Sequence, residues 1–282
     1  MIGAPPFERV GIIGLGLIGG SVALAARRCW PGLHITACDP APITHEAVSQ
    51  GAITAVVDHI EDLTASDLII IATPVQTVPH VLEVLALTGT RALVTDVSST
   101  KRTVMEAAAR TRLTFVGGHP VAGSESSGLA AARADLFDSK PWLLVSATTG
   151  GADDAGDAVE AMLTTFTVAL GAKPSWTDAV THDRVMAHVS HAPQVVSTAL
   201  MAASGEAGGP DGVAWSGSGF ADMTRLASSS SDVWQGILST NADFIAEALH
   251  GIAAKLPTSS QALMDAPSVR DLFERARALK KA

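Results

Sequence analysis

The sequence predicts an α/β protein, with an N-terminal Rossmann-type doubly wound sheet followed by an all-helical C-terminal domain. Two observations support this fold class. As far as about residue 145, short apolar runs alternate with helical stretches, which is the rhythm of βαβ units. Beyond that point the strand pattern nearly disappears, and apolar residues repeat at helical spacing. We place the boundary in a small-residue stretch around residue 150, which gives domains over 1–150 and 151–282.

Apolar runs predict the strands of the first domain. They cover residues 10–13, 34–38, 67–72, 92–95, 114–116 and 142–146. Near-continuous apolar runs of this length are typical of strands that are buried on both faces of a parallel sheet. Helical stretches such as 19–28 and 101–110 lie between them.

The second domain is predicted to consist of helices. The longest runs from about 178 to 204 and contains Pro193, a Gly/Ser-rich loop follows over 205–219, and further helices cover 232–255 and 269–281. The first of these stretches lacks a strongly charged face over much of its length. Because such a surface must be buried, we expect a homodimer formed mainly through the helical domain.

Composition narrows the class of partner. The chain has 282 residues, 47% of them hydrophobic, which is ample for a core and excludes intrinsic disorder. Its formal net charge is -9, and it has no long Lys/Arg run, which argues against nucleic acid or an anionic membrane as the partner. We therefore expect a small-molecule substrate.

Cysteine use and the N-terminus favour a cytoplasmic protein. Cys29 and Cys38 have no metal-ligand spacing and form at most one disulfide, so we expect a reducing compartment and no metal site. The first ten residues lack the basic and apolar regions of a signal peptide. No apolar run is long enough to span a membrane.

The strongest local signal is a GxGxxG motif between the first predicted strand and the first predicted helix. In this pattern Gly14 makes a tight turn, Gly16 lets the backbone approach a pyrophosphate, and Gly19 lets the helix pack on the sheet. Leu17 and Ile18 complete the loop. The helix N-terminus supplies free N–H groups and a positive dipole end for phosphates. The motif therefore predicts a dinucleotide site.

Asp39 indicates which dinucleotide binds. It ends the second predicted strand, 20 residues beyond Gly19, where a carboxylate accepts hydrogen bonds from ribose hydroxyls and repels a 2′-phosphate. The Pro-Ala-Pro that follows offers no Arg or Lys to such a phosphate. We therefore expect NAD rather than NADP. FAD shares the fingerprint, but the chain carries no second flavin motif.

Three polar segments follow predicted strands, at the edge of a parallel sheet where ligands bind. Thr73 and Pro74 follow the third predicted strand, residues 96–101 follow the fourth, and residues 117–125 follow the fifth. Each is also compatible with an ordinary turn or helix cap. Their position beside a nucleotide motif favours a site, and we assign Thr73, Pro74 and Ser98 to the cofactor.

His119 is the sharpest candidate for catalysis, although a lone histidine is more often structural. It lies at a strand end in a glycine-rich turn. Imidazole, with a pKa of about 6.5, can accept a proton from an alcohol while the neighbouring carbon loses hydride. Ser99 is predicted to hydrogen-bond to His119 and orient it. We expect activity to fall at acidic pH, with an apparent pKa of about 6.5.

Two other features carry less weight. Lys101 is compatible with an anion contact or with a solvated side chain in the first turn of a helix. His182, His188 and His191 do not form a convergent metal-binding set.

Taken together, the motifs resemble those of the prephenate/arogenate dehydrogenases, a family of tyrosine biosynthesis. The matching segments are residues 14–21, 96–101, 117–123, 190–193 and 219–225, in the family's order and approximate spacing. The resemblance runs from about residue 8 to 255, and the combination is highly specific.

The resemblance implies roles for single residues. His119 corresponds to the catalytic hydrogen-bond acceptor, and Ser99 to a serine that contacts both this histidine and the substrate hydroxyl. Arg225 corresponds to an arginine that binds a substrate carboxylate. Further substrate-binding candidates are Gln194, Ser124, Glu125 and His191.

Two departures from the family pattern leave the substrate open. Ser98 stands where many members have glycine, and Gln194 stands where many have a histidine that contacts the substrate. Glutamine forms hydrogen bonds but carries no charge. The choice between prephenate and arogenate therefore stays open.

We predict an NAD-dependent prephenate dehydrogenase, which converts prephenate to 4-hydroxyphenylpyruvate by oxidative decarboxylation. Alternatives are an arogenate (cyclohexadienyl) dehydrogenase, a secondary-metabolism enzyme acting on 4-amino-4-deoxyprephenate, another dehydrogenase with a helical second domain, or a dinucleotide-sensing module. The sensing module would not need His119, Ser99 and Arg225 together, so their joint presence favours an enzyme.

Overall fold

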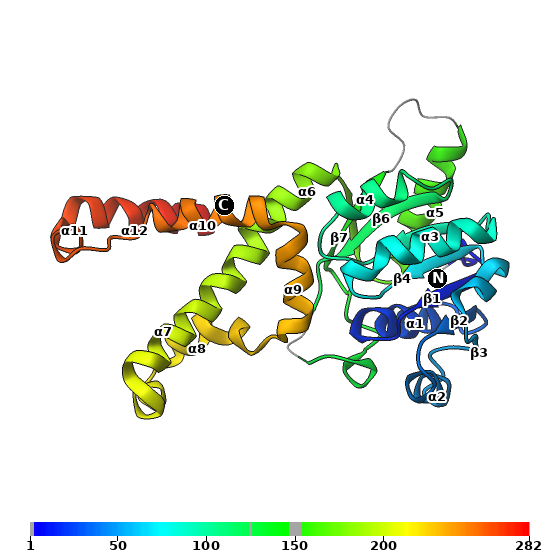
Figure 1. Cartoon of the computed structure of the whole chain (residues 1–282), viewed down its shortest axis with the longest axis horizontal. Helices are drawn as coiled ribbons and strands as arrows, with labels where there is room; N and C mark the ends of the chain where they lie inside the picture. The colour runs from blue at the N-terminus through cyan, green and yellow to red at the C-terminus, as the bar shows by residue number, and fades with distance from the viewer. Residues whose placement is uncertain (1–2, 124–125, 147–153, 282) are drawn as a thin grey trace.

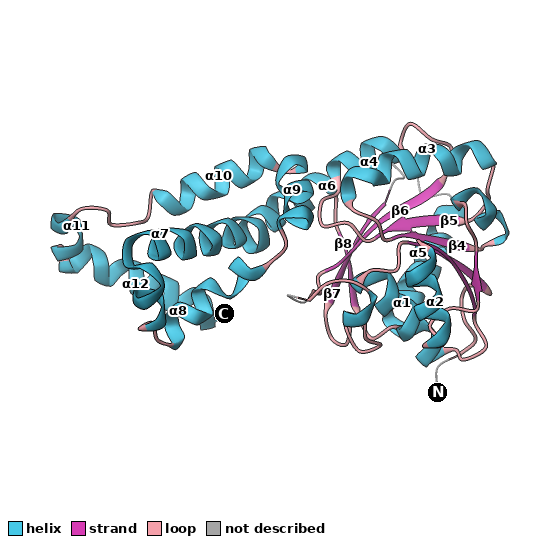
Figure 2. Ribbon diagram, turned by 60° about the horizontal axis from the view of Figure 1, so that its bottom comes forward, coloured by secondary structure: helices cyan, strands magenta, loops and turns pink. Residues whose placement is uncertain are grey.

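The computed structural model describes residues 3–123, 126–146 and 154–281. Two parts lie next to each other: a sheet flanked by helices, and an elongated helical part that extends away from it (Figures 1 and 2). The predicted fold class is confirmed.

Eight strands form one sheet in the described part of the chain. They are β1 (Arg9–Ile13), β2 (His34–Cys38), β3 (Ala55–Val56), β4 (Leu68–Ile71), β5 (Leu93–Asp96), β6 (Thr114–Pro120), β7 (Pro141–Ser146) and β8 (Lys173–Trp176), in the order β3-β2-β1-β4-β5-β6-β7-β8. Every neighbouring pair is parallel except β6 and β7, which are antiparallel. The strand order reverses between β1 and β4, which is where doubly wound sheets bind dinucleotides.

Helices cover both faces of the sheet. They are α1 (Leu17–Cys29), α2 (Ala41–Ser49), α3 (Val78–Thr88), α4 (Arg102–Ala108) and α5 (Asp154–Ala169), with the short 3-10 turns η1 (Ile60–Ala65), η2 (Val75–Thr77) and η3 (Leu129–Ala131). α1 and α5 pack into one core with alternate strand residues, and α3 and α4 pack into a second core on the opposite face. Apolar side chains on both faces of β4 explain its unbroken Leu-Ile-Ile-Ile sequence.

The sheet continues beyond residue 150, which itself falls outside the described residues. Phe166 of α5 stacks on Trp30, the residue that follows α1, with ring centroids 5.8 Å apart, and β8 pairs with β7. Residues 173–176 thus differ from the expectation of helix throughout. Their Lys-Pro-Ser-Trp sequence contains no apolar run because β8 is a short and largely exposed edge strand.

The second part is helical. Its elements are α6 (Ala179–Met186), the π-helical turn η4 (Ala187–His191), α7 (Ala192–Ala214), α8 (Ser218–Thr224), the 3-10 turn η5 (Arg225–Ser228), α9 (Ser231–Thr240), α10 (Ala242–Ala253), α11 (Ser260–Met264) and α12 (Ala266–Lys281). The loop predicted over 205–219 is helical as far as Ala214, with a break where Gly209 has a φ of 62° before Pro210. The Gly/Ser-rich composition marked the break and the short linker after α7 but overstated the length of the loop.

The core of the helical part is small within one protomer. Its fully buried apolar cluster consists of Ala187, Ala192, Ile245 and Ala248 among the described residues. α8, α11 and α12 contain no buried residue. None of the described helices is long and apolar enough to cross a membrane.

Candidate active site

The glycine-rich turn joins β1 to α1 at the point where the strand order reverses. Gly14 has a φ of 94°, and a Cβ there would lie 2.7 Å from the carbonyl oxygen of Ala72, so only glycine fits without strain. Gly19 is buried where α1 packs against this turn. Gly16, the N-cap of α1, has no side-chain cap, and a Cβ there would meet no atom within 4 Å. The turn thus offers open backbone and a helix N-terminus to a phosphate.

Asp39 closes β2 beside this turn. Its carboxylate accepts a hydrogen bond from the backbone N–H of Leu15, and the residue is half-buried. The contact holds the carboxylate next to the glycine turn, where the ribose of a dinucleotide would lie. Leu17 and Ile18 are partly buried and pack against the core, so they contribute backbone more than side chain to this surface.

Two further predicted cofactor segments end neighbouring strands. Thr73 and Pro74 follow β4, where the Thr73 hydroxyl accepts a hydrogen bond from Thr77 Oγ1 at 2.9 Å. Ser98 follows β5 and is buried, and its Oγ has no hydrogen-bond partner in the described part of the chain. A buried hydroxyl without a partner is rare in folded proteins and fits a ligand that supplies the missing hydrogen bond. The edge therefore fits a dinucleotide.

Asp96 ties β5 to β6 beneath this edge. Its fully buried carboxylate accepts hydrogen bonds from the N–H of Ser98 at 2.9 Å and of Gly118 at 3.0 Å, and it pairs with Lys101 Nζ. A Cβ at Gly118 would lie 2.5 Å from the carbonyl oxygen of Asp96, so glycine permits this close approach. Lys101 is fully buried, which shows that it is not a solvated first-turn side chain. The network fixes the end of β6 immediately before His119.

His119 heads a chain of buried hydrogen bonds that crosses from the sheet to the helical part. His119 Nδ1 lies 2.9 Å from His182 Nε2, and His182 Nδ1 lies 2.8 Å from Asp183 Oδ1. The Asp183 carboxylate also accepts hydrogen bonds from the backbone N–H groups of Lys101, at 2.7 Å, and Arg102, at 2.9 Å. The oxygens of the ionised Asp183 carboxylate can only accept hydrogen bonds. This determines the direction of each hydrogen bond between His119, His182 and Asp183.

That direction fixes the tautomers of both histidines. Because the ionised Asp183 accepts, His182 carries its proton on Nδ1 and presents Nε2 as an acceptor. His119 then donates from Nδ1 to His182, and its Nε2 keeps a free lone pair. His119 is therefore set up as a base or hydrogen-bond acceptor through Nε2.

Burial controls the charge of this chain. It lowers the pKa of His119 well below 6.5, and His182, Lys101 and His191 lower it further through their charges. Burial alone would raise the pKa of Asp183, but hydrogen bonds from His182, Arg102 and Lys101 outweigh it and lower that pKa. His119 is thus neutral and Asp183 ionised near neutral pH. The expectation of a pKa of about 6.5 for His119 is replaced by a lower value, because the side chain is only 7% exposed.

Ser99 lies three residues beyond the end of β5 and is half-buried. Among the described residues no hydrogen bond joins it to His119, whose Nδ1 is already engaged by His182. The orienting role that the sequence suggested for Ser99 is filled here by His182. A contact between Ser99 and a substrate hydroxyl stays a prediction.

Three candidates come from the helical part. His191 is buried in the π-helical turn, with Nδ1 3.2 Å from Asn241 Nδ2 and Nε2 without a partner in the described part of the chain. Gln194, one helical turn along, donates from Nε2 to the carbonyl oxygen of Leu226 at 2.7 Å. Arg225 precedes Leu226, begins η5 and is exposed. Gln194 therefore holds the turn that carries Arg225.

The helical part meets the sheet at this same edge. Thr240 Oγ1 at the end of α9 lies 2.8 Å from Thr100 Oγ1. Arg102 of α4 pairs with Asp243 of α10 and hydrogen-bonds to Asn241 Oδ1 at 3.0 Å. Through Asn241, these contacts bring His191 to the side of the sheet that carries His119. Ser124 and Glu125, the remaining substrate candidates, lie outside the described residues.

Sequence reasoning missed the residues that support His119. The sequence indicated His182 only as one of three histidines without a convergent metal-binding set, and it singled out no role for Asp183. It placed Asp96 in a polar strand-end segment or at a helix cap, without the buried network that the structure shows. A clue was present in the His-Asp dipeptide, since an acid next to a histidine can fix its tautomer. The partner of that pair is 63 residues away along the chain, so only the fold reveals it.

Comparison with known proteins now identifies the family. Residues 22–169 match the family model described as prephenate dehydrogenase, nucleotide-binding domain. Residues 178–274 match the model described as prephenate dehydrogenase, dimerization domain. The chain belongs to the prephenate dehydrogenase family. The predicted family, the predicted class of nucleotide-dependent dehydrogenase and the predicted homodimer are confirmed by this pair of domains.

Individual members of the prephenate dehydrogenase family agree with this assignment. A prephenate dehydrogenase of Bacillus subtilis is 37% identical over 246 residues, which are 83% of this chain and 64% of that protein. The chain therefore spans a little under two thirds of that relative.

Solved structures of the family have the same architecture. Prephenate dehydrogenase from Aquifex aeolicus, in complex with hydroxyphenyl propionate and NAD+, has a TM-score of 0.84 at 27% identity, covering 97% of this chain and 96% of that one. Arogenate dehydrogenase from Synechocystis has a TM-score of 0.75 at 27% identity, with the same coverages of 97% and 96%. The fold thus accommodates enzymes named for either substrate.

Proposed function

We propose that this protein is an NAD-dependent prephenate dehydrogenase that oxidatively decarboxylates prephenate to 4-hydroxyphenylpyruvate. The observation that carries the proposal is the buried His119–His182–Asp183 chain, which ends at the same sheet edge as the glycine turn. A base at that edge is what a dehydrogenase needs beside its nicotinamide cofactor.

Proton acceptance is the task of His119. NAD held at this edge would accept the hydride that the hydroxyl-bearing carbon of the substrate gives up. Nε2 of His119 takes the hydroxyl proton. The electron pair of the ring–carboxylate bond enters the ring as CO₂ leaves, and the aromatic oxygen regains the proton from His119. Positive charge that develops on His119 is shared through His182 with the ionised Asp183, which stabilises the imidazolium without itself taking the proton.

Binding of the substrate requires a partner for its carboxylates. Arg225 supplies a planar, permanently charged group that can pair bidentately with one of them. His191 Nε2 is a buried polar atom without a hydrogen-bond partner among the described residues, and the pKa of His191 is lowered to about 4, chiefly by burial. His191 is therefore a neutral hydrogen-bonding group and not a second cation. Ser99 remains assigned to the substrate hydroxyl.

We assign the binding of NAD to residues that follow the C-terminal ends of β1, β2, β4 and β5. Gly14, Gly16 and Gly19 form the phosphate turn together with the backbone of Leu17 and Ile18, and Asp39 binds the ribose. Thr73, Pro74 and Ser98 complete the edge. The absence of a cation in the Pro-Ala-Pro segment after Asp39 supports NAD over NADP.

Arogenate is the second candidate substrate, because the helical part has neutral Gln194 and relatives of both names share the fold. Steady-state kinetics with prephenate and arogenate, each with NAD and NADP, test the proposal. We expect the highest kcat/KM for prephenate with NAD, and chromatography should identify 4-hydroxyphenylpyruvate as the product. Turnover of neither substrate would refute the proposed function, and a preference for arogenate would replace the substrate.

We also propose a cytoplasmic location and a domain boundary later than residue 150. Cys29 and Cys38 are both free thiols, which supports a reducing compartment. α5 and β8 pack with the sheet, which supports a boundary close to Thr177. Limited proteolysis tests the boundary by the size of the fragment that still binds NAD.

A further inference from the structure

Asn241 lies between α9 and α10 and connects two members of the candidate site. Its side chain is fully buried. The amide nitrogen Nδ2 lies 2.8 Å from the backbone carbonyl oxygen of Asp183 and 3.2 Å from Nδ1 of His191. The amide oxygen Oδ1 lies 3.0 Å from Nη2 of Arg102. Asn241 thus joins His191 to the backbone of Asp183, whose carboxylate supports His182.

The partners of Asn241 fix which way its amide faces. The carbonyl oxygen of Asp183 can only accept a hydrogen bond, and the guanidinium of Arg102 can only donate one. Nδ2 therefore faces Asp183 and Oδ1 faces Arg102, because a turned amide would bring two acceptors together and two donors together. The second hydrogen of Nδ2 is then directed to Nδ1 of His191.

Arg102 is anchored by residues other than Asn241. Its guanidinium pairs bidentately with Asp243, at 2.8 and 2.5 Å, and its Cζ lies 4.2 Å from the ring centre of Phe244. Its Nε also lies 3.3 Å from Oδ2 of Asp183. Because three residues hold this donor in place, it opposes rotation of the Asn241 amide.

The orientation of Asn241 determines where His191 carries its hydrogen. Burial chiefly lowers the pKa of His191 to about 4, so the ring is neutral near neutral pH and has a single N–H group. Since Nδ1 accepts from Asn241, that hydrogen is on Nε2. Nε2 is buried and has no hydrogen-bond partner in the described part of the chain. A buried donor without a partner is rare and destabilising, which indicates that a group from outside the chain supplies the acceptor.

We propose that Asn241, held by Arg102, is a positioning residue that makes His191 a hydrogen-bond donor to a carboxylate or carbonyl oxygen of the substrate, a ligand whose identity rests on the proposed function. His119 accepts through its Nε2 and His191 donates through its Nε2, so the two rings bind opposite groups, a hydroxyl and an acceptor oxygen. Both rings belong to one buried cluster, since charge on His191 would lower the pKa of His119. An ammonium group cannot replace the oxygen, because two donors would then face each other.

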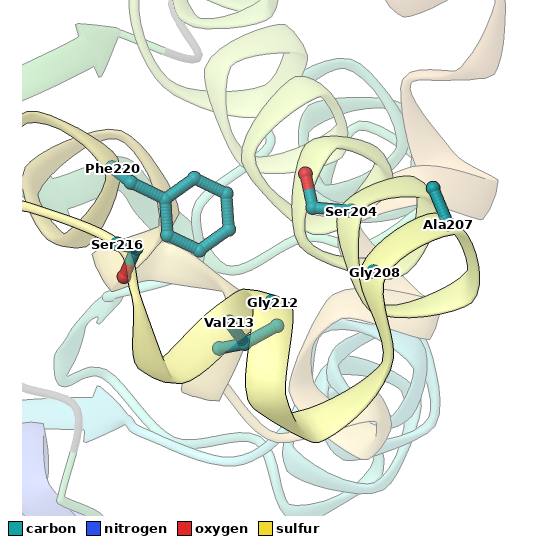
Figure 3. Close-up of a pocket in the computed structure, with 7 residues that line it drawn as sticks. All are labelled: Ser204, Ala207, Gly208, Gly212, Val213, Ser216 and Phe220. Atoms are coloured by element: carbon teal, nitrogen blue, oxygen red, sulfur yellow. The ribbon is translucent and has the colours of Figure 1, made fainter.

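The pocket at the C-terminal end of α7 does not account for the partner of His191. It has a volume of about 360 Å³ and is lined by residues of α7, α8 and the link between them, among them Ser204, Val213 and Phe220 (Figure 3). Neither His191 nor Asn241 lines it. The acceptor for His191 is therefore not a molecule held in that pocket.

Nitrogen NMR of the full-length protein tests the position of the hydrogen directly. Long-range ¹H–¹⁵N spectra of protein with ¹⁵N-labelled histidine, recorded near neutral pH, distinguish a ring nitrogen that carries hydrogen from one that does not. The signals that disappear in His191→Leu are those of His191. We expect hydrogen on Nε2 in the unaltered protein, and hydrogen on Nδ1 or on both nitrogens would overturn the proposal. No substrate is present, so the result does not depend on the proposed function.

Asn241→Asp replaces the donor by an acceptor of the same shape. The carboxylate accepts from Nδ1 of His191, so we expect the hydrogen to move from Nε2 to Nδ1. Gln261→Glu, the same chemical change at an exposed position of α11, is the matched control and leaves the hydrogen on Nε2. Unchanged helical circular dichroism and NAD binding show that both parts of a variant are folded. Hydrogen that stays on Nε2 in folded Asn241→Asp would remove Asn241 as a positioning residue, and the spectrum of the unaltered protein tests the tautomer even if this variant does not fold.

Substitution of His191 itself tests the contact with the substrate. His191→Leu removes the donor, so the KM for prephenate should rise on the order of 10–100-fold, with a smaller effect on kcat. His191→Gln keeps an N–H donor at the end of its side chain and should raise KM less. An unchanged KM in His191→Leu, or an equal rise in both variants, would overturn the contact. If the unaltered protein turns over neither prephenate nor arogenate, the proposed function fails while the tautomer measured by NMR stands.

Discussion

The protonation state of His119 follows from its surroundings more than from its residue type. Burial lowers the pKa of His119 well below 6.5, so the ring is neutral near neutral pH and is protonated only in more acidic solution than a free histidine. Protonated His119 cannot accept a proton from the substrate. The pH dependence of the enzyme is therefore shifted to the acidic side of free histidine.

We expect kcat/KM to stay level as the pH falls through the ordinary titration range of histidine, about 6.5, and to fall only in more acidic solution. His119→Asn should lower kcat by about 10²–10⁴-fold, leave the Kd of NAD unchanged and remove the acid limb. Stopped-flow or steady-state assays across pH measure both effects. An acid limb centred at 6.5 that persists in His119→Asn would place the base on another residue.

His182 acts on His119 as a positioning residue. His182→Phe keeps an aromatic ring but removes the acceptor for the Nδ1 proton of His119, so the reactive tautomer is no longer fixed. We expect kcat to fall on the order of 10²-fold, with little change in the Kd of NAD. His188→Phe is the matched control, because His188 is exposed and its hydrogen bond goes to the Arg184 carbonyl one turn away. A kcat of His182→Phe close to that of the control would remove His182 from the mechanism.

Gln194 also acts through another residue. Its amide is already bonded to Leu226, and its Oε1 accepts from Ser229 at 3.4 Å, so it positions η5 and Arg225 more than it contacts the substrate. Gln194→Glu keeps the shape but loses the donor to the Leu226 carbonyl, and should raise the substrate KM about tenfold while kcat and NAD binding hold. Glu206→Gln, an exposed residue further along α7, should leave KM unchanged. A fall in kcat with constant KM would assign Gln194 to the chemical step instead.

The sequence pointed to His119 and the glycines as candidates, but not to the buried side chains that surround them. His119 and the glycines are recognisable because each lies in a local pattern. Asp96 and Lys101 meet Asp183 only in the folded chain, 82 residues beyond Lys101. The burial of Lys101 excludes the solvated side chain, which was one of two alternatives for this residue. A local pattern cannot report on a contact across the sheet.

At the scale of elements, the β1–α1 turn and the end of β2 act together in cofactor choice. Asp39 accepts from the Leu15 N–H, which holds its carboxylate beside the turn. Asp39→Asn keeps the shape but removes the negative charge that would repel a 2′-phosphate, so the ratio of kcat/KM for NAD to that for NADP should fall by about tenfold. Asp58→Asn, an exposed acid two residues after β3, is the control. An unchanged ratio in Asp39→Asn would show that selectivity arises elsewhere.

The strands that the sequence predicts well are those with both faces buried along their whole length. β1, β4 and β5 are apolar because both faces are covered, and each was placed within one or two residues. β3 has two residues and β8 is a polar edge strand, so neither leaves an apolar pattern. The helical stretch from 178 to 204 divides into α6, η4 and α7, and the π-helical turn between them brings His191 into the buried region beside Asn241.

At the scale of the whole molecule, the sheet part and the helical part differ in how large an apolar core a single chain gives them. The sheet part has large apolar cores on both faces, whereas the fully buried apolar cluster of the helical part is made of Ala187, Ala192, Ile245 and Ala248 in the described residues. α8 and η5, which lead to Arg225, contain no buried residue. Dimer formation should therefore stabilise the substrate-binding side and leave the cofactor side unaffected.

Dilution tests this difference. As the protein is diluted through its dimer dissociation constant, the substrate KM should rise, because α8 and η5 lose the packing that holds Arg225 in position. The Kd of NAD should stay constant, because Gly14, Gly16 and Asp39 lie beside the large apolar core of the sheet part. That core forms within a single chain. Activity assays and NAD titrations over the same concentrations, with the dimer fraction measured by ultracentrifugation, give both quantities. An equal KM for monomer and dimer would mean that one chain builds the whole substrate site, and a parallel loss of NAD affinity would mean that dissociation loosens the entire protein.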